Sequence, residues 1–235
     1  MKSLKHILLS AVLAAGLSAP AMAEKAVAEL YTSQGCNSCP PADAILSDLA
    51  KRPDVLALSF HVTYWDYLGW QDTFGREENT KRQRWYKKVL GAQVYTPQLV
   101  VNGTAQVVGN QRAAVSQAVK NTPALPVSID IAKNGAGGLT VNLGGAGHSL
   151  NAAIFVVRYD SSQTVAIKRG ENRGRTMTYS NVVRDMKDVG GYDGTATTIA
   201  LPQIDMWAQG SDRCAILIQD KRSGRILGAQ SVSLR

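Results

Sequence analysis

The spacing of hydrophobic and polar residues changes along the first half of the chain. Small and bulky residues alternate over 26–32, and an apolar run covers 55–61, so we predict that both segments are buried strands. Between them, the apolar residues over 43–51 recur at helical spacing. A strand, a helix and a second strand in this order predict a right-handed parallel crossover.

The following elements extend this unit. We predict a charged helix, two short strands and another helix over 77–90, 98–101, 105–108 and 111–120. Asn102-Gly103 between the two strands is the strongest short signal for a hairpin. Asn110 directly precedes the last helical pattern and is expected to cap that helix. The predicted order of the unit is therefore βαβαββα.

The pattern changes near 121–126, and the rest of the chain has the spacing of an all-β structure. Apolar or alternating segments, separated by Gly- and Asp-rich turns, cover 127–132, 139–143, 151–159, 164–168, 177–188, 195–200, 214–219 and 226–232. About eight strands at this spacing favour an immunoglobulin-like β-sandwich. We therefore predict an α/β domain over 24–122 and a β-sandwich domain over 123–235.

The N-terminus has the pattern of an export signal. Basic residues precede an apolar run over 7–17, and residues 21–23 match the small-x-small motif of signal peptidase substrates. We expect 1–23 to be a signal peptide that is cleaved after Ala23, and the mature protein to be periplasmic or secreted. No apolar run is long enough to span a bilayer, so an integral membrane protein is not expected.

Composition narrows the classes of function. The chain has a formal net charge of +8, but no basic run is long enough to indicate binding of nucleic acid. Its three cysteines are too few for a four-cysteine zinc site. Cys214 opens an apolar strand and is expected to be a buried, inert thiol. Cys36 and Cys39 remain as candidates for chemistry, and no cofactor is expected.

Cys36 and Cys39 are compatible with a redox pair, a metal site or a structural disulfide. A bond between them closes a very short loop, which constrains the unfolded chain least, so a purely structural role explains little. The pair lies at the N-terminal edge of the first predicted helix, where free N–H groups and the helix dipole stabilise a thiolate. We expect Cys36, at the outer edge, to be the nucleophile and Cys39, one turn inward, to be the resolving thiol.

Three features together resemble the thioredoxin superfamily over roughly 26–121: the element order, the cysteine pair entering the first helix, and Thr96-Pro97 just before the third strand. The segments AELYTSQGCNSCPPAD and FHVTYWDYLGW are similar to a family of secreted bacterial thioredoxin-like proteins of unassigned function. The resemblance implies a central mixed sheet flanked by helices, and a thiol–disulfide oxidoreductase whose partners are periplasmic protein thiols or disulfides. It also implies a cis Pro97 that faces the cysteine pair, while the backbone of Thr96 receives an extended substrate chain.

Glu29 is the candidate acid of the implied mechanism. Thioredoxins commonly place a buried acid on the first strand, and Glu29 lies one position further from the first cysteine than that pattern requires. One additional residue in the loop over 32–35 would restore the match. A buried carboxyl group has a raised pKa and can shuttle the proton of the resolving thiol. The alternative is a partly solvated strand glutamate.

Two further segments have both a structural and a functional interpretation. Residues 61–74 contain five aromatic side chains, which either pack against the domain or form a lid beside the cysteine pair. In the second case, Trp65 and Asp66 are expected to contact substrate. The basic segment 168–175 is either a solvated turn or a site for an anion or a partner.

Two other functions are alternatives. Cys36, Cys39 and His61 could bind Cu(I), which prefers thiolates. However, the copper carriers of the superfamily that resemble this chain use a wider cysteine spacing and a histidine much further along, so we assign no metal ligand. The other alternative is a redox-silent binding protein, in which the disulfide is structural and the aromatic segment is the binding feature.

Overall fold

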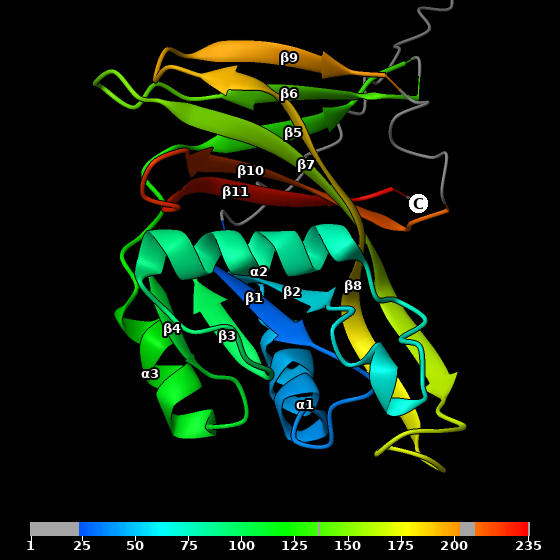
Figure 1. The fold of residues 1–235 in the computed structure, drawn as a ribbon. Coiled ribbons are helices and arrows are strands. Elements are labelled where there is room, and N and C mark those ends of the chain that lie inside the picture. Colours follow the sequence, from blue (N-terminus) through cyan, green and yellow to red (C-terminus); the bar gives the residue numbers. More distant parts are fainter. Residues whose placement is uncertain (1–23, 136, 203–209, 235) are drawn as a thin grey trace, which may run out of the picture.

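The computed structural model describes residues 24–135, 137–202 and 210–234. The elements of the first half are β1 (Ala26–Thr32), α1 (Pro40–Leu49), β2 (Val55–His61), η1 (Asp66–Leu68), α2 (Glu77–Leu90), β3 (Gln98–Val101), β4 (Ala105–Val108) and α3 (Arg112–Asn121). Those of the second half are β5 (Ile129–Lys133), β6 (Leu139–Leu143), β7 (Ala152–Ala166), β8 (Thr176–Tyr192), β9 (Thr197–Leu201), β10 (Arg213–Asp220) and β11 (Ile226–Ser233). Figure 1 shows their arrangement.

A single large mixed sheet runs through both halves of the chain. Within the described residues, it has eight strands in the order β11-β10-β7-β8-β2-β1-β3-β4. A second sheet has three strands in the order β5-β6-β9.

The first half is consistent with a thioredoxin-like α/β core. β1 pairs in parallel with β2 and antiparallel with β3, which pairs with β4. Successive residues of a strand point to opposite faces of the sheet. Ala28 and Leu30 therefore pack on the face covered by α1 and α3, whereas Val27 and Tyr31 pack on the face covered by α2. Apart from the short helix η1, the predicted order βαβαββα is confirmed.

The immunoglobulin-like sandwich is not confirmed, because β7, β8, β10 and β11 extend the first sheet. β8 lies beside β2 through the parallel pair of Ser59 and Val182. Segments 151–159 and 164–168, predicted as two strands, fall mostly within the single strand β7, which ends at Ala166 and pairs with β8 along its length. Two register shifts interrupt this pairing, and such shifts increase the local twist of long strands.

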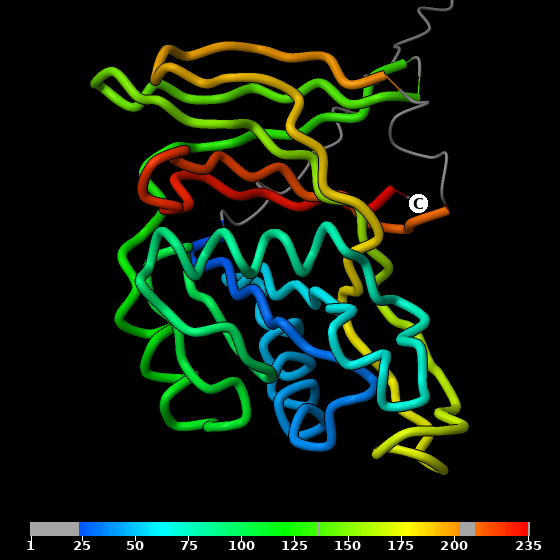
Figure 2. The backbone as a smooth tube through the Cα atoms, in the orientation of Figure 1, coloured from blue at the N-terminus to red at the C-terminus, as the bar shows by residue number. Residues whose placement is uncertain are grey.

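The β7–β8 hairpin joins two layers of the molecule. At one end, Ile154 of β7 and Ile216 of β10 pack against Val141 of the three-stranded sheet. At the other end, the hairpin passes the core of the first half and reaches the loops that follow β1 and β2 (Figure 2). The division into domains at 122–123 stays a prediction, and the large sheet is continuous across it.

Two predictions concern the membrane and the export of the protein. None of the helices in the described ranges is long and apolar enough to cross a membrane. The predicted signal peptide, 1–23, lies outside the described residues. Export of the protein therefore stays a prediction.

Candidate functional site

Cys36 and Cys39 form a disulfide at the start of α1, with their Cα atoms 5.4 Å apart. Cys39 is the N-cap residue of the helix, and its carbonyl oxygen accepts hydrogen bonds from the first turn. Pro40 and Pro41 follow directly in that turn, where proline is tolerated because the N–H groups have no intrahelical partner. Cys36 is only 3% exposed and Cys39 is fully buried, so most of the disulfide is covered by protein.

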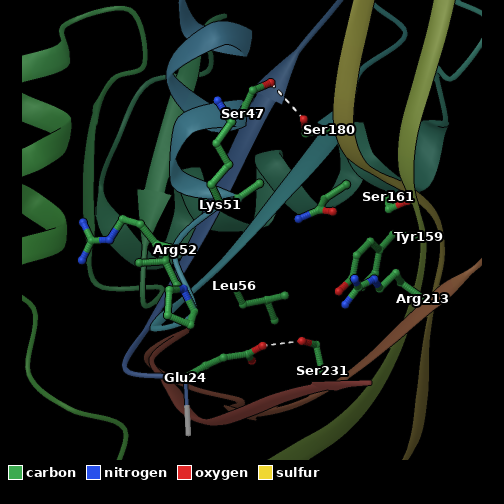
Figure 3. A pocket seen from close by; sticks show the side chains of 14 residues that line it. Glu24, Ser47, Lys51, Arg52, Leu56, Tyr159, Ser161, Ser180, Arg213 and Ser231 are labelled. Atoms are coloured by element: carbon green, nitrogen blue, oxygen red, sulfur yellow. Dashed lines mark hydrogen bonds between the residues drawn. The ribbon is translucent and has the colours of Figure 1, made fainter. Parts of the chain in front are cut away.

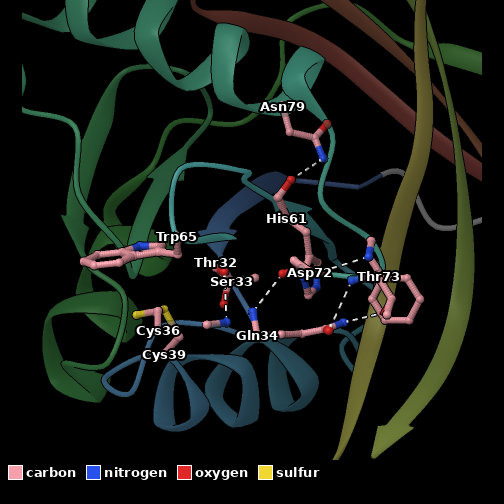
Figure 4. Close-up of polar contacts among 12 residues, drawn as sticks. Thr32, Ser33, Gln34, Cys36, Cys39, His61, Trp65, Asp72, Thr73 and Asn79 are labelled. Carbon is pink, nitrogen blue, oxygen red and sulfur yellow. Dashed lines mark hydrogen bonds and ion pairs between the residues drawn. A yellow bond between two sulfur atoms is a disulfide. The ribbon is translucent and has the colours of Figure 1, made fainter. Parts of the chain in front are cut away.

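Trp65 connects the loop before the cysteine pair with the segment before β3. Its indole Nε1 donates a hydrogen bond of 2.7 Å to Oγ1 of Thr96. Its Cβ would lie 3.2 Å from a Cβ placed on Gly35, so the two backbones are in close contact directly before Cys36. Figure 4 shows the indole beside the disulfide. Trp65 thus links Thr96 to the loop before Cys36, and the binding of substrate by Trp65, Thr96 and Pro97 stays a prediction.

Pro97 lies near the first turn of α1, with Gly109 next to both. The Thr96–Pro97 peptide bond is cis, which confirms the prediction. The Pro97 carbonyl oxygen accepts a hydrogen bond of 2.9 Å from Gly109 N–H. A Cβ placed on Gly109 would lie 3.3 Å from the Cβ atoms of both Pro97 and Ala42. Since Ala42 is three residues after Cys39, Pro97 belongs to the same small region as the disulfide.

Asp66 supports the aromatic segment. Its Oδ1 accepts a hydrogen bond of 3.1 Å from the N–H group of Asp72, and burial raises its pKa. Gln34, which is fully buried, makes further polar contacts with the segment. Its Oε1 accepts a hydrogen bond from Trp70 Nε1 at 2.8 Å, and its Nε2 donates one to Thr73 Oγ1 at 2.9 Å. The segment is thus packed onto the domain, and the contact of Asp66 with substrate stays a prediction.

One aromatic side chain of this segment remains open to solvent. Tyr67 is 77% exposed, and its ring stacks on Trp65 with centroids 6.3 Å apart. The most exposed aromatic ring of the segment therefore lies next to Trp65.

Glu29 points away from α1. Residues Ala28 and Leu30 face α1, so Glu29 faces α2 on the opposite side of the sheet. It is fully buried, which makes the partly solvated alternative wrong. Both of its carboxylate oxygens accept hydrogen bonds from Arg82, at 2.6 and 2.9 Å, and Tyr86 donates a further bond of 2.7 Å. The structure does not bring this carboxylate together with the cysteine pair, and its catalytic role stays a prediction.

Asp43 is a buried acid that sequence reasoning missed. It lies in the first turn of α1, four residues after Cys39, and it is buried in the core. Thr32 Oγ1 donates a hydrogen bond of 2.8 Å to its Oδ1. Burial raises the pKa of Asp43 to about 7. The interaction with His61 and the hydrogen bond from Thr32 lower this pKa, whereas the nearby Asp72 raises it further. The available signal was its position one turn after a cysteine and three residues before the apolar Leu46 on the same helix.

His61 and Asp72 form a second buried pair near Asp43. The distance from His61 Nδ1 to Asp72 Oδ2 is 2.8 Å, and both side chains are fully buried. Burial alone raises the pKa of Asp72, but His61 and hydrogen bonds from Gln34 N–H and Phe74 N–H hold it below the ordinary value. Figure 4 shows these contacts next to Gln34, in the loop that leads to the cysteine pair.

The side chains of this cluster are not arranged as a metal site. Within the described residues, no group of three or more histidine, cysteine, aspartate or glutamate side chains is arranged to hold a metal ion. His61 Nδ1 is occupied by Asp72, and His61 Nε2 has no hydrogen-bond partner in the described part of the chain. No metal ligand is assigned.

The tip of the β7–β8 hairpin covers the cysteine loop. The amide Nδ2 of Asn172 donates hydrogen bonds to the carbonyl oxygens of Gln34, at 2.9 Å, and Cys36, at 2.8 Å. The Glu171 carboxylate accepts a bond of 3.3 Å from Asn37 N–H. A segment of the second half therefore forms part of the site. Sequence reasoning missed this role, since no local signal links residues this far apart.

A polar cavity of about 380 Å³ lies elsewhere, between the C-terminal half of α1 and strands β7 and β8 (Figure 3). Glu24, Tyr159 and Arg213 are among its lining residues. Burial raises the pKa of Glu24 to about 6, although Ser231 donates hydrogen bonds to its carboxyl group. None of the cysteine-site residues named above lines this cavity.

Comparisons with known proteins identify a family and a fold. The model of a family described as "Protein of unknown function (DUF1223)" matches residues 27–219. The crystal structure of an Agrobacterium tumefaciens protein, a structural-genomics target, is similar with a TM-score of 0.80 and 35% sequence identity, covering 91% of this chain and 96% of that chain. HBP35 of Porphyromonas gingivalis is similar in fold alone, with a TM-score of 0.62 and 12% identity over 90% of this chain and 75% of that chain. No curated protein is similar enough in sequence to count as a relative.

Proposed function

We propose that the chain, which belongs to the DUF1223 family of proteins of unknown function, is a thioredoxin-like thiol–disulfide oxidoreductase. It is exported, and it exchanges disulfides with periplasmic protein thiols or disulfides. The observation that carries the proposal is the disulfide at the N-terminus of α1, in the region where Trp65 and Thr96 meet. A helix N-terminus stabilises the thiolate that each exchange step needs.

The exchange proceeds through a mixed disulfide. In the oxidising direction, a client thiolate attacks Sγ of Cys36, a client–Cys36 disulfide forms, and Cys39 leaves as a thiolate that takes up a proton. A second client thiolate then attacks the client sulfur, so that a client disulfide forms and Cys36 leaves as a thiolate. Two electrons pass from the client dithiol to the disulfide of the protein. A client disulfide and the reduced protein react through the same steps in reverse.

Proton transfer at Cys39 belongs to Asp43 in this mechanism, in place of Glu29. Asp43 lies four residues after Cys39 in the first turn of α1, and residues four apart on a helix are neighbours on one face, which supports this assignment. Its pKa of about 7 lets it donate and accept a proton near neutral pH. Its Oδ2 has no hydrogen-bond partner among the described residues, which leaves that oxygen available to the thiol proton.

A trapping experiment tests the function. Cys39→Ser keeps the attacking thiol and removes the release step, so mixed disulfides between Cys36 and clients accumulate as reducible high-mass species on a non-reducing gel. Cys36→Ser traps far less, because the remaining thiol is fully buried. Cys214→Ser is the matched control and changes nothing, since this thiol is buried and burial raises its pKa to about 12.

A redox-silent binding protein is the second candidate, and the coverage of the disulfide favours it. Cys36 is only 3% exposed, and Asn172 and Glu171 lie over the loop. In that case the wild-type disulfide resists a mild dithiol, and Cys39→Ser traps no partner. Ready reduction of the Cys36–Cys39 bond together with trapped clients excludes this candidate.

A further inference from the structure

The tip of the β7–β8 hairpin is a structured part of the candidate site. The connection between the strands is longer than the two to five residues that a hairpin usually needs. Ile167 is buried, and backbone hydrogen bonds join it to Arg175 and Gly174 across the tip. Gly170 approaches the aromatic segment, because a Cβ at this position would lie 3.1 Å from the Cβ of Trp70.

The tip also presents four cations beside the cysteine loop. Lys168, Arg169, Arg173 and Arg175 are all exposed. Within the described part of the chain, none of the four side chains makes an ion pair with a carboxylate; the salt bridges found there involve other residues. The acidic residue of the tip, Glu171, faces Asn37 N–H. The tip thus has an excess of unpaired positive charge.

This charge lies close to the reacting sulfur. Arg173 directly follows Asn172, whose amide is 2.8 Å from the carbonyl oxygen of Cys36. The cations follow and precede the residue that contacts the Cys36 backbone, and the Debye length at moderate ionic strength is about 8–10 Å, so a client that approaches Cys36 passes through the electrostatic field of the tip. Unpaired surface cations attract anionic partners and raise their rate of association.

We propose that the exposed cations of the 168–175 tip form a docking surface for client proteins whose reactive cysteine is flanked by acidic residues. The inference rests on the proposed exchange activity and specifies its clients. Asn172 and Glu171 hold the tip over the cysteine loop, and Lys168, Arg169, Arg173 and Arg175 attract the acidic segment. The second half of the chain thereby selects the substrate for chemistry that the first half performs.

The test uses three cysteine peptides of equal length, with the cysteine flanked by aspartates, serines or lysines. We expect the oxidised wild-type protein to form a mixed disulfide with the aspartate peptide about tenfold faster than with the lysine peptide at low salt, and the difference to shrink at high salt. Arg169→Glu combined with Arg173→Glu should abolish or reverse the preference. It should leave the rate with the serine peptide within about twofold of the wild-type rate, because that peptide carries no charged flanks.

The matched control is Lys221→Glu combined with Arg222→Glu, in the turn between β10 and β11 at the opposite end of the molecule (Figure 1). This variant carries the same change of net charge and should keep the preference for the aspartate peptide. Equal rates for all three peptides, or equal losses in both double variants, would overturn the docking surface while the exchange activity stands. Absence of reaction with every peptide would overturn the proposed function, and the docking surface with it.

Discussion

Trp65 Nε1 donates a hydrogen bond of 2.7 Å to Oγ1 of Thr96, so that one side chain links the loop before Cys36 with the residue before Pro97. This hydrogen bond therefore fixes the distance between two segments that a client would contact at the same time. This contact is a direct target for substitution, because phenylalanine keeps most of the ring and removes the donor.

Trp65→Phe should lower the rate of disulfide exchange with a peptide by about threefold to tenfold, and the free energy of unfolding by about 1 kcal/mol. The rate is measured by the consumption of peptide thiol, and stability by urea denaturation. Trp85→Phe on α2 is the control, since Trp85 is partly buried against the same apolar cluster as Trp65 but does not take part in the hydrogen bond to Thr96. A Trp65 variant with the wild-type exchange rate would show that this link does not serve client binding.

Asp43 predicts a specific dependence of stability on pH. Its pKa is about 7 in the folded protein against an ordinary value of 3.8. Between these values the folded state keeps a proton that the unfolded chain has lost, so the free energy of unfolding falls as the pH rises from about 4 to about 7. Asp43→Asn still offers an acceptor to Thr32 and removes this loss. Relative to the wild type, the variant should gain up to about 4 kcal/mol between pH 4 and pH 8.

The measurement is urea denaturation of both proteins across that range of pH. Glu24, whose pKa burial raises to about 6, contributes equally to both proteins and cancels in the difference. Asp48→Asn is the control on the same helix: hydrogen bonds from Arg112 and Lys51 lower the pKa of Asp48, so this variant should show no such change above pH 4. Parallel stability curves for the wild type and Asp43→Asn would contradict the assigned pKa.

Glu29→Gln separates the two candidate acids. The substitution leaves the buried Arg82 guanidinium without its carboxylate, so the free energy of unfolding should fall by about 3–5 kcal/mol. Because Asp43 has a pKa of about 7, the exchange rate of the wild type should change with pH near 7. The folded fraction of Glu29→Gln should keep this inflection, whereas Asp43→Asn should remove it. The control is Glu78→Gln, because Glu78 forms an exposed ion pair with Arg76 and should cost less than about 1 kcal/mol. If Glu29→Gln removes the inflection instead, the proton passes through Glu29.

Asn172→Ala should uncover the disulfide. The substitution removes hydrogen bonds of 2.9 and 2.8 Å to the carbonyl oxygens of Gln34 and Cys36. At about 1 kcal/mol for each bond, the rate of reduction by a small dithiol should rise by up to about thirtyfold. Asn142→Ala is the control, since the partners of its side-chain amide, Asp130 and Thr198, lie on the other sheet, away from the cysteine loop. An unchanged rate would mean that small thiols reach Cys36 without displacement of the tip.

The sequence by itself determined the local features of this protein. The order βαβαββα follows from hydrophobic spacing, and the β3–β4 hairpin follows from Asn102-Gly103, whose residues adopt positive φ angles of 46° and 64°. The position of Cys39 at the start of α1 follows from the prolines that come after it. All these features depend on interactions within a few residues, so a single segment contains the information that specifies them.

Only the tertiary structure decided which side chains share the site. The strand that carries Glu29 was predictable, but the face to which it points depends on the pairing of β1 with its neighbours, and that face belongs to α2 and Arg82. Asp43 became a buried acid because Thr32 and the His61–Asp72 pair lie beside it. The contact of Asn172 with Cys36 spans 136 positions and exists because β8 joins the sheet next to β2. Long-range strand pairing of this kind leaves no periodic trace in either segment, since each strand alone is compatible with several neighbours.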